Sequence, residues 1–277
     1  PEYLIHEHIS GNKYRKLKYN LIEAKEKGFS KLLSFGGAFS NHIAAVAAAG
    51  KEFEFDTIGV IRGDELKHQI GSNPTLKFAQ SCDMQLEFVS REAYRNKTSE
   101  LLLSELGKRH GNFYLLPEGG TNDLAVKGCE EILTEADKSF DIICCPVGTG
   151  GTISGLINSS LPSQSVLGFP ALKGDFLKDE ISNFTKNTNW KLITDYHFGG
   201  YAKINSELIS FINRFKLDYG IPLDPVYTGK MLFGIFDMLN TNKISENARV
   251  LAIHTGGLQG IDGMNQKLIK KKLPLLK

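Results

Sequence analysis

Short runs of apolar residues recur along the chain, separated by longer segments whose residues favour helices. Within each run the apolar side chains occupy successive positions, whereas a strand exposed on one face would alternate them with polar ones. Runs of this kind are typical of strands that are buried on both faces of a parallel sheet. We predict strands at residues 31–35, 56–62, 85–89, 113–116, 141–147, 166–169, 191–194 and 249–254.

The segments between these strands predict helices. Residues 40–49 are rich in alanine, a strong helix former, and further helices are expected at residues 73–79, 101–109 and 122–133. Strands that alternate with helices build an α/β fold whose sheets are mainly parallel and covered by helices. Ligands of such sheets bind beyond the carboxyl ends of the strands, so the loops that follow strands are the candidate functional segments.

Composition narrows the class of protein. A chain of 277 residues can form one large core or two closely joined lobes, and its 41% hydrophobic and 23% charged residues are ordinary for a globular protein. The net charge of +2 gives no field that would attract nucleic acid, so we expect a small-molecule partner. Because no segment has the pattern of a signal peptide or the length of a membrane span, we expect a cytoplasmic protein without membrane association.

The cysteines carry no sign of a metal site. Cys82 and Cys129 stand alone, and Cys144 and Cys145 are adjacent within an apolar run. None of these spacings is that of metal ligands, so we expect reduced thiols and no bound metal.

A glycine-rich segment at residues 147–155 (VGTGGTISG) follows a predicted strand and opens a helix. Its glycines allow the backbone to approach an anion, and Thr149 and Thr152 can donate hydroxyl hydrogen bonds, which together predict a phosphate site. By itself the segment could be a plain strand-to-helix turn. The dinucleotide fingerprint would need glycine where Ile153 stands, and a P-loop would end in Gly-Lys-Ser/Thr, so NAD and ATP are disfavoured.

A second loop, residues 36–42 (GGAFSNH), also joins a strand to a helix. Free amides at the helix start suit a carboxylate, and Ser40, Asn41 and His42 place a hydroxyl, an amide and an imidazole beside them. Two simpler interpretations remain open, since Ser40 is an acceptable N-cap and His42 could be a packed structural histidine.

Three further residues complete a set of chemical groups. Lys13 lies between a glycine turn and a helix, where a positionable amine can hold an aldehyde cofactor as an imine, although most such lysines are surface charges. Tyr227 after a proline turn and Thr255 after an apolar strand can present hydroxyls to the same crevice, or be a packed aromatic and a turn residue. Taken together, these groups are what a pyridoxal phosphate enzyme acting on an amino acid requires.

Six motifs resemble, in order, those of the 1-aminocyclopropane-1-carboxylate deaminase and D-cysteine desulfhydrase family. They are SGNKYRKLKY (10–19), SNH (40–42), PEGGTN (117–122), VGTGGTISG (147–155), LDPVYTGK (223–230) and IHTGG (253–257). The resemblance implies a tryptophan synthase β-like fold, in which two α/β lobes, each with a mainly parallel, helix-covered sheet, clasp pyridoxal 5'-phosphate. It implies a smaller lobe at residues 17–120, a larger cofactor-binding lobe at 1–16 plus 121–277, and a homodimer. Family members usually carry an apolar strand before the Gly-Asn-Lys run, which we expect ahead of Pro1.

The resemblance also implies a role for each site residue. Lys13 forms the internal imine, Asn41 bonds the ring oxygen, Thr255 faces the pyridine nitrogen, and Tyr227 and Tyr201 are the active-site tyrosines. Ser40, with Asn41 and His42, lies beside the substrate carboxylate. The residues implied for the phosphate are Lys16, Gly148, Thr149, Gly150, Gly151 and Thr152.

Two departures from the family's deaminases favour one activity. Ring-opening deaminases of the family carry an acidic residue where this chain has Thr228, and Ser-Asn-Gln where it has Ser-Asn-His at 40–42. We therefore expect α,β-elimination by a D-cysteine desulfhydrase, with Lys13 removing the α-proton and pyruvate, ammonia and sulfide as products. The alternative within the family is the deaminase, which gives 2-oxobutanoate and ammonia. An alternative of another class is a non-catalytic protein that binds pyridoxal phosphate.

Overall fold

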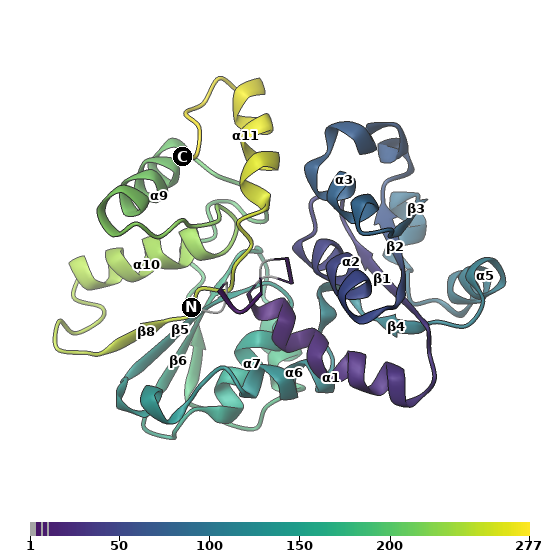
Figure 1. Cartoon of the computed structure of the whole chain (residues 1–277). Coiled ribbons are helices and arrows are strands. Elements are labelled where there is room, and N and C mark those ends of the chain that lie inside the picture. The colour runs from purple at the N-terminus through teal and green to yellow at the C-terminus, as the bar shows by residue number, and fades with distance from the viewer. Residues whose placement is uncertain (1–3, 7, 10) are drawn as a thin grey trace.

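The computed structural model describes residues 4–6, 8–9 and 11–277. Two parallel four-stranded sheets lie in separate lobes, each covered by helices (Figure 1). Every strand pairing among the described residues is parallel. The α/β class with two helix-covered parallel sheets, predicted from the apolar runs, is therefore confirmed.

The first lobe has strand order β3-β2-β1-β4. Its strands are β1 (Lys31–Gly36), β2 (Asp56–Arg62), β3 (Gln85–Val89) and β4 (Tyr114–Leu116). Its helices are α2 (Asn41–Phe53), α3 (Pro74–Ser81), α4 (Arg91–Arg95) and α5 (Glu100–His110), with short 3-10 turns η2 (Asp64–Ser72) and η3 (Glu118–Gly120).

The second lobe has strand order β7-β6-β5-β8. Its strands are β5 (Ile142–Val147), β6 (Ser165–Pro170), β7 (Trp190–Leu192) and β8 (Val250–Ala252). Its helices are α6 (Asp123–Glu130), α7 (Gly151–Ser159), α8 (Phe176–Ser182), α9 (Ser206–Tyr219), α10 (Thr228–Asn240) and α11 (Gly260–Lys270), with the 3-10 turn η4 (Glu135–Ser139).

Small residues allow α2 to lie close to its sheet. The helix buries consecutive alanines, and a side chain added at Gly50 would place its Cβ 2.2 Å from Cγ2 of Thr57 on β2. Leu32 of β1 is buried in the same apolar cluster as Ile43 and Val46 of α2. This close packing fixes the start of α2, and with it Ser40 and Asn41, at the carboxyl end of β1.

Helix α1 (Asn12–Glu26) joins the lobes. It packs mainly against α6 of the second lobe and also contacts α2 of the first (Figure 1). The boundary between residues 16 and 17, which the resemblance implies, falls inside this helix. On the opposite side of the molecule α11 approaches α3, and Gln266 Nε2 donates to the Ser72 carbonyl at 3.3 Å. Both contacts link the two lobes.

The expected elements differ from the structure mainly at their ends. The strand predicted at 249–254 stops at Ala252, because the chain turns through Gly256 and Gly257, both with positive φ. The helix predicted at 122–133 begins after Asn122, whose side chain caps it by accepting from the Ala125 amide. All four cysteines are buried and none of them forms a disulfide, in agreement with the expected reduced thiols.

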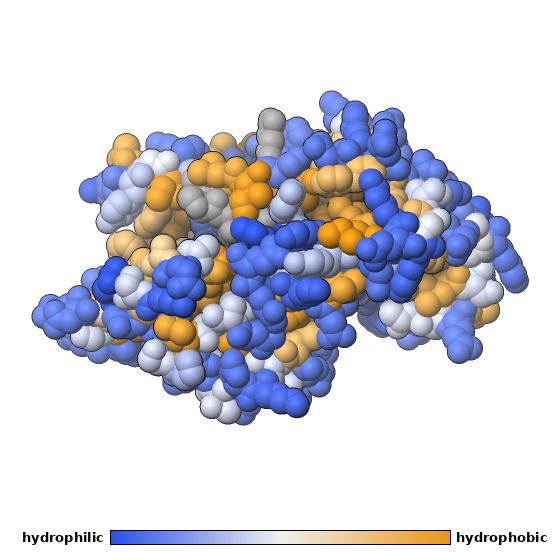
Figure 2. Space-filling view, turned by 60° about the horizontal axis from the view of Figure 1, so that its bottom comes forward, coloured by the Kyte–Doolittle hydropathy of each residue, from blue (hydrophilic) through white to orange (hydrophobic). Residues whose placement is uncertain are grey.

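The surface is of mixed character. Figure 2 shows a face on which hydrophilic residues surround several separate hydrophobic patches. Among the residues that the structure describes, no helix combines the length and the apolar composition that crossing a membrane requires.

Candidate active site

A cleft of about 1200 Å³ lies between the two lobes. Its walls come from the start of α1, the loops that follow β1, β5 and β8, and the loop that leads into α10. The predicted site residues that line it are Lys13, Lys16, Ser40, Asn41, His42, Gly148, Thr149, Gly150, Thr152, Tyr201, Tyr227 and Thr255. Gly151 lies just behind the wall, where an added Cβ would be 2.9 Å from the Thr121 hydroxyl.

Lys13 presents an amine to this cleft from the first turn of α1. Burial of the amine, and next the charge of Lys16, lower the pKa of Lys13 to about 7. Within the described part of the chain, its Nζ has no hydrogen-bond or ion-pair partner. A large fraction of the amine is therefore neutral and nucleophilic near neutral pH.

The backbone around Lys13 is fixed by the loop after β8 and by the first turn of α7 in the second lobe. The Asn12 amide donates to the Thr255 carbonyl at 3.4 Å, and the Asn12 side chain donates to the Thr152 hydroxyl at 2.6 Å. Gly11 has φ +63, and a Cβ there would lie 1.9 Å from the Thr255 carbonyl oxygen. Only glycine fits this approach, which brings the start of α1 against the loop after β8.

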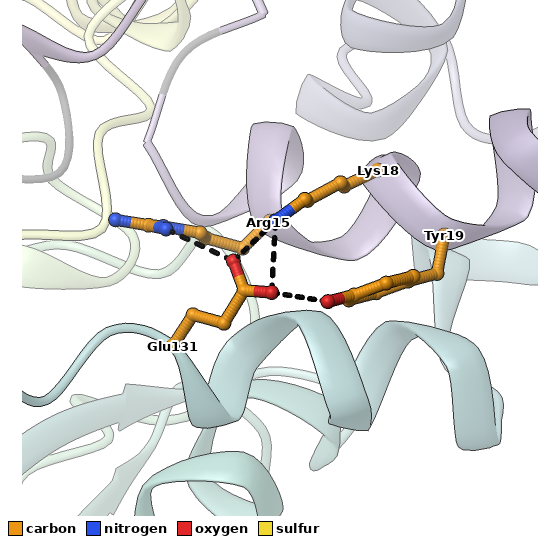
Figure 3. A network of polar contacts seen from close by, with 4 residues as sticks. All are labelled: Arg15, Lys18, Tyr19 and Glu131. Carbon is orange, nitrogen blue, oxygen red and sulfur yellow. Dashed lines mark hydrogen bonds and ion pairs between the residues drawn. The ribbon is translucent and has the colours of Figure 1, made fainter.

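A carboxylate at the end of α6 holds α1 in place. Glu131 accepts hydrogen bonds from Lys18, at 2.7 and 2.8 Å, and from the Tyr19 hydroxyl, and Arg15 lies 3.4 Å away (Figure 3). The two helices approach closely, since a Cβ at Gly128 would lie 2.0 Å from the Arg15 carbonyl oxygen. This contact sets the position of the helix that carries both cleft lysines.

The loop between β5 and α7 forms an anion-binding turn. Gly150 adopts φ +84 as the N-cap of α7, which leaves the first amides of the helix without intrahelical partners. Lys16 Nζ donates to the Gly119 carbonyl at 2.9 Å, to the Thr121 hydroxyl at 2.8 Å and to the Thr149 hydroxyl at 3.3 Å. A buried ammonium beside free helix-start amides and threonine hydroxyls is an arrangement that suits a phosphate.

The loop between β1 and α2 provides a second helix start. Ser40 caps α2, with its Oγ accepting from the Ile43 amide at 3.3 Å, so the capping interpretation is correct. Asn41 Oδ1 accepts from Gln259 of the opposite lobe at 3.0 Å. The unpaired amides at this helix start can donate hydrogen bonds to a carboxylate.

His42 is buried behind this loop. Its Nε2 is 2.8 Å from the Ser34 hydroxyl, and its Nδ1 has no hydrogen-bond partner among the described residues. Burial, followed by the charges of Lys13 and Lys16, holds the pKa of His42 well below its usual value. The imidazole is therefore neutral at physiological pH.

Two tyrosines face each other on the second-lobe wall. The Tyr201 and Tyr227 rings are 6.3 Å apart at an interplanar angle of 66°. Burial raises the pKa of Tyr227 well above its usual value, with further contributions from Tyr201 and Asp224. Burial also raises the pKa of Tyr201, although a hydrogen bond with Tyr227 acts against this. Both phenols are protonated at neutral pH and can act as proton donors.

Asp224 fixes Tyr227 at the start of α10. One carboxylate oxygen accepts from the Val226 and Tyr227 amides, and the other accepts from the Thr228 amide and hydroxyl, all at 2.7–2.8 Å. Thr228 is fully buried and is not among the described residues that line the cleft. The expectation that Thr228 favours one substrate therefore gains no direct support, because this buried side chain contacts Asp224.

Six charged residues of the cleft wall, including Glu180, Asp262 and Lys267, were not singled out from the sequence, and three of them have contacts that bear on the site. These three are Arg62, Glu118 and Asp224. Arg62 ends β2, and its guanidinium lies 5.8 Å from the centre of the Tyr94 ring. Glu118 accepts from the Tyr94 hydroxyl at 2.8 Å and pairs with Lys97 at 3.1 Å. The position of Arg62 after a buried strand is the signal that could have identified it.

The described residues contain no group of three or more His, Cys, Asp or Glu side chains that could hold a metal ion.

Comparisons with known proteins point to one family. Residues 2–256 match the family model described as pyridoxal-phosphate dependent enzyme. A Pyrococcus horikoshii protein that carries the inferred name 1-aminocyclopropane-1-carboxylate deaminase is 30% identical, over 94% of this chain and 84% of that protein. A mitochondrial Arabidopsis thaliana protein, named bifunctional D-cysteine desulfhydrase/1-aminocyclopropane-1-carboxylate deaminase, is 29% identical over 91% of this chain and 70% of its own length.

A solved structure agrees with these sequence matches. The crystal structure of a homologue of 1-aminocyclopropane-1-carboxylate (ACC) deaminase superposes with a TM-score of 0.83 at 28% identity. The superposition covers 97% of this chain and 86% of that one.

Proposed function

This chain belongs to the pyridoxal-phosphate dependent enzyme family, and we propose that within it the protein is a lyase that removes the β-substituent of a small amino acid. The family makes the chain an enzyme and pyridoxal phosphate its cofactor, so the non-catalytic alternative is set aside. The observation that carries the finer proposal is the Lys13 amine, which shares one cleft with an anion-binding turn and a second helix start.

The residues of the cleft fit the cofactor. Lys13 offers a neutral amine for covalent attachment of the aldehyde, and the turn before α7 offers amides and hydroxyls to the phosphate. Lys16 supplies the positive charge beside that turn. The family resemblance assigns Asn41 to the ring oxygen and Thr255 to the pyridine nitrogen, and both residues line this cleft. The bound cofactor supplies an electron sink that acidifies the α-proton of an amino acid.

The protein groups divide the remaining tasks. The substrate carboxylate binds at the start of α2, next to Ser40, where unpaired amides and the helix dipole favour an anion. With substrate on the cofactor, the Lys13 amine would take the α-proton, for which a pKa of about 7 is well matched. Tyr227 and Tyr201, both protonated, deliver a proton to the departing group.

We assign D-cysteine as the preferred substrate. The balanced reaction converts D-cysteine and water to pyruvate, ammonia and hydrogen sulfide. A threonine hydroxyl at the pyridine nitrogen is neutral and makes a weaker electron sink than a charged partner, which suits a good leaving group such as a thiol. The desulfhydrase name of the Arabidopsis relative supports the same choice.

Deamination of 1-aminocyclopropane-1-carboxylate is the second candidate. The names of the Pyrococcus and Arabidopsis relatives support it, and the burial of Thr228 removes one argument against it. Purified enzyme offered D-cysteine, L-cysteine, D-serine and the cyclopropane amino acid separates the candidates. Sulfide and pyruvate from D-cysteine support the first proposal, whereas 2-oxobutanoate from the cyclopropane substrate alone would replace it with the second.

Two further proposals concern the oligomeric state and the boundaries of the lobes. We propose a homodimer, which light scattering on the purified protein tests against the chain mass of 30.7 kDa. We also keep residues 17–120 as the smaller lobe and residues 1–16 plus 121–277 as the larger one. Residues 1–3, 7 and 10 of this division, and Ser10 of the first motif, lie outside the described residues.

A further inference from the structure

Lys230 is a buried cation that the proposed chemistry does not use. The residue is 2% exposed, and its Nζ donates to the His197 and Gly200 carbonyls, both at 2.8 Å. In the described part of the chain no carboxylate lies within ion-pair distance of this amine. Because an unpaired buried charge is costly, the two carbonyl dipoles have to replace its water shell. Burial accordingly lowers the pKa of Lys230 to about 8, although Asp224 acts in the opposite direction.

The carbonyls that Lys230 binds belong to an unusual loop. Four residues of the loop have positive φ: Phe198 (53), Gly199 (89), Gly200 (114) and Ala202 (53). For the two residues that carry a side chain, this conformation costs energy, so the loop needs outside support to persist.

The same two carbonyls organise successive turns of this loop. The His197 carbonyl accepts from the Gly200 amide at 3.0 Å, and the Gly200 carbonyl accepts from the Lys203 amide at 3.2 Å. Lys230 thus binds the acceptor of each turn, and Tyr201 lies inside the second turn. We propose that Lys230 is a positioning residue that holds the Tyr201 phenol against Tyr227 in the cleft.

The start of α10 provides the fixed reference for this contact. Tyr227 is the N-cap residue of α10, Lys230 lies within its first turn, and the Asp224 carboxylate fixes the same turn with hydrogen bonds. One lysine therefore ties the loop that carries one tyrosine to the helix that carries the other.

Packing alone does not locate Tyr201. The residue as a whole is 46% exposed, although its ring contacts that of Tyr227 at 6.3 Å between centres. The direction of the ring then depends on the backbone of residues 197–203, which the two Lys230 hydrogen bonds hold. The inference rests on the proposed function, in which the tyrosines transfer a proton to the leaving group.

The test compares three variants of the loaded enzyme. Lys230→Met keeps an unbranched side chain of similar size but removes the ammonium that donates both hydrogen bonds, and Tyr201→Phe removes the phenol hydroxyl. Tyr196→Phe is the matched control, because it deletes a 2.7 Å hydrogen bond between the start of the same loop and Asp237 of the same helix. Tyr196→Phe leaves in place the hydrogen bonds from Lys230 to the His197 and Gly200 carbonyls.

If Lys230 acts through Tyr201, Lys230→Met lowers kcat about as much as Tyr201→Phe does, at least roughly tenfold, with little change in KM. The double variant is then no slower than Tyr201→Phe alone, and Tyr196→Phe keeps the wild-type kcat. Independent, multiplicative losses in the double variant, or an equal loss in Tyr196→Phe, overturn the inference.

Hydrogen exchange tests the two Lys230 hydrogen bonds without catalytic turnover. In Lys230→Met, the Gly200 and Lys203 amides exchange faster than in the wild type, while in Tyr196→Phe they do not. Unchanged exchange in Lys230→Met overturns the inference. If Lys230→Met does not fold, Lys230→Leu, which also lacks a donor, takes its place with the same criteria. Should the wild type turn over no amino acid, the proposed function fails by itself, and exchange still decides the role of Lys230.

Discussion

Lys16 follows Lys13 by one turn of α1, and its charge adds to burial in lowering the pKa of Lys13 to about 7. The same ammonium bonds the Thr149 hydroxyl in the anion-binding turn. Lys16 therefore both lowers the pKa of the Lys13 amine and supplies positive charge to the phosphate end of the cleft.

This relationship predicts how the reactivity of the Lys13 amine depends on pH in the cofactor-free protein. A lowered pKa means that the amine is neutral above about pH 7, so its reductive methylation by formaldehyde rises through pH 7 and then levels off. Surface lysines keep gaining reactivity towards their ordinary pKa, about 10.4. Mass spectrometry of the peptide that contains Lys13 measures the profile.

Replacing Lys16 by glutamine removes the nearby charge and moves the Lys13 profile to higher pH. A profile of Lys13 that coincides with those of surface lysines in the wild type would be incompatible with the lowered pKa.

The anion-binding turn predicts a specific effect at Gly150. Alanine there must adopt φ +84 and bring its Cβ to 3.2 Å from Ile181 Cγ1, so Gly150→Ala costs about 1 kcal/mol or more and weakens cofactor binding. Gly28→Ala is the matched control, because Gly28 also has positive φ (72) but nothing lies within 4 Å of an added Cβ. Both variants lower the free energy of unfolding of the cofactor-free protein.

Titration with pyridoxal phosphate distinguishes the two glycine variants. The dissociation constant rises in Gly150→Ala and stays at the wild-type value in Gly28→Ala. Equal affinities in both variants would remove this turn from the cofactor site.

We predict that loss of the hydrogen bonds between Thr228 and Asp224 lowers the stability of the fold. Thr228→Val removes the hydroxyl that donates to Asp224 Oδ2 at 2.7 Å and accepts from the Asp224 amide at 3.0 Å. Leaving these buried groups unpaired costs about 1–3 kcal/mol, measured as the free energy of unfolding in urea. Thr228→Ser keeps the hydroxyl and serves as the control.

Thr228→Val lowers kcat only to the extent that it displaces Tyr227, because the Tyr227 amide keeps its hydrogen bond to Asp224. Altered preference between D-cysteine and the cyclopropane substrate in Thr228→Ser would show instead that Thr228 meets the ligand.

The sequence predicts the parts of this molecule whose chemistry is local. Apolar runs locate the strands, and glycines next to hydroxyl residues mark the loop of Thr149 and Thr152, because each signal lies within a few residues. The position of the loops after strands then brings the predicted groups into one cleft.

Other features depend on contacts between distant segments. Lys230 is separated from the loop of Gly200 by a whole helix, and a lysine near a helix start is normally a surface charge, so nothing local marks it as buried. The direction of Thr228 follows from the Asp224 cap and not from its own residue type. Arg62 joins the cleft because β2 ends beside the loop of Gly37.

Reduction of the cofactor-bound enzyme with borohydride, followed by peptide mapping, tests the central claim most directly. The account predicts that the yellow protein is bleached and that the reduced cofactor is found on Lys13, while Lys13→Ala carries none after the same treatment. Attachment to another lysine, or a protein that holds no cofactor after reconstitution, would contradict it.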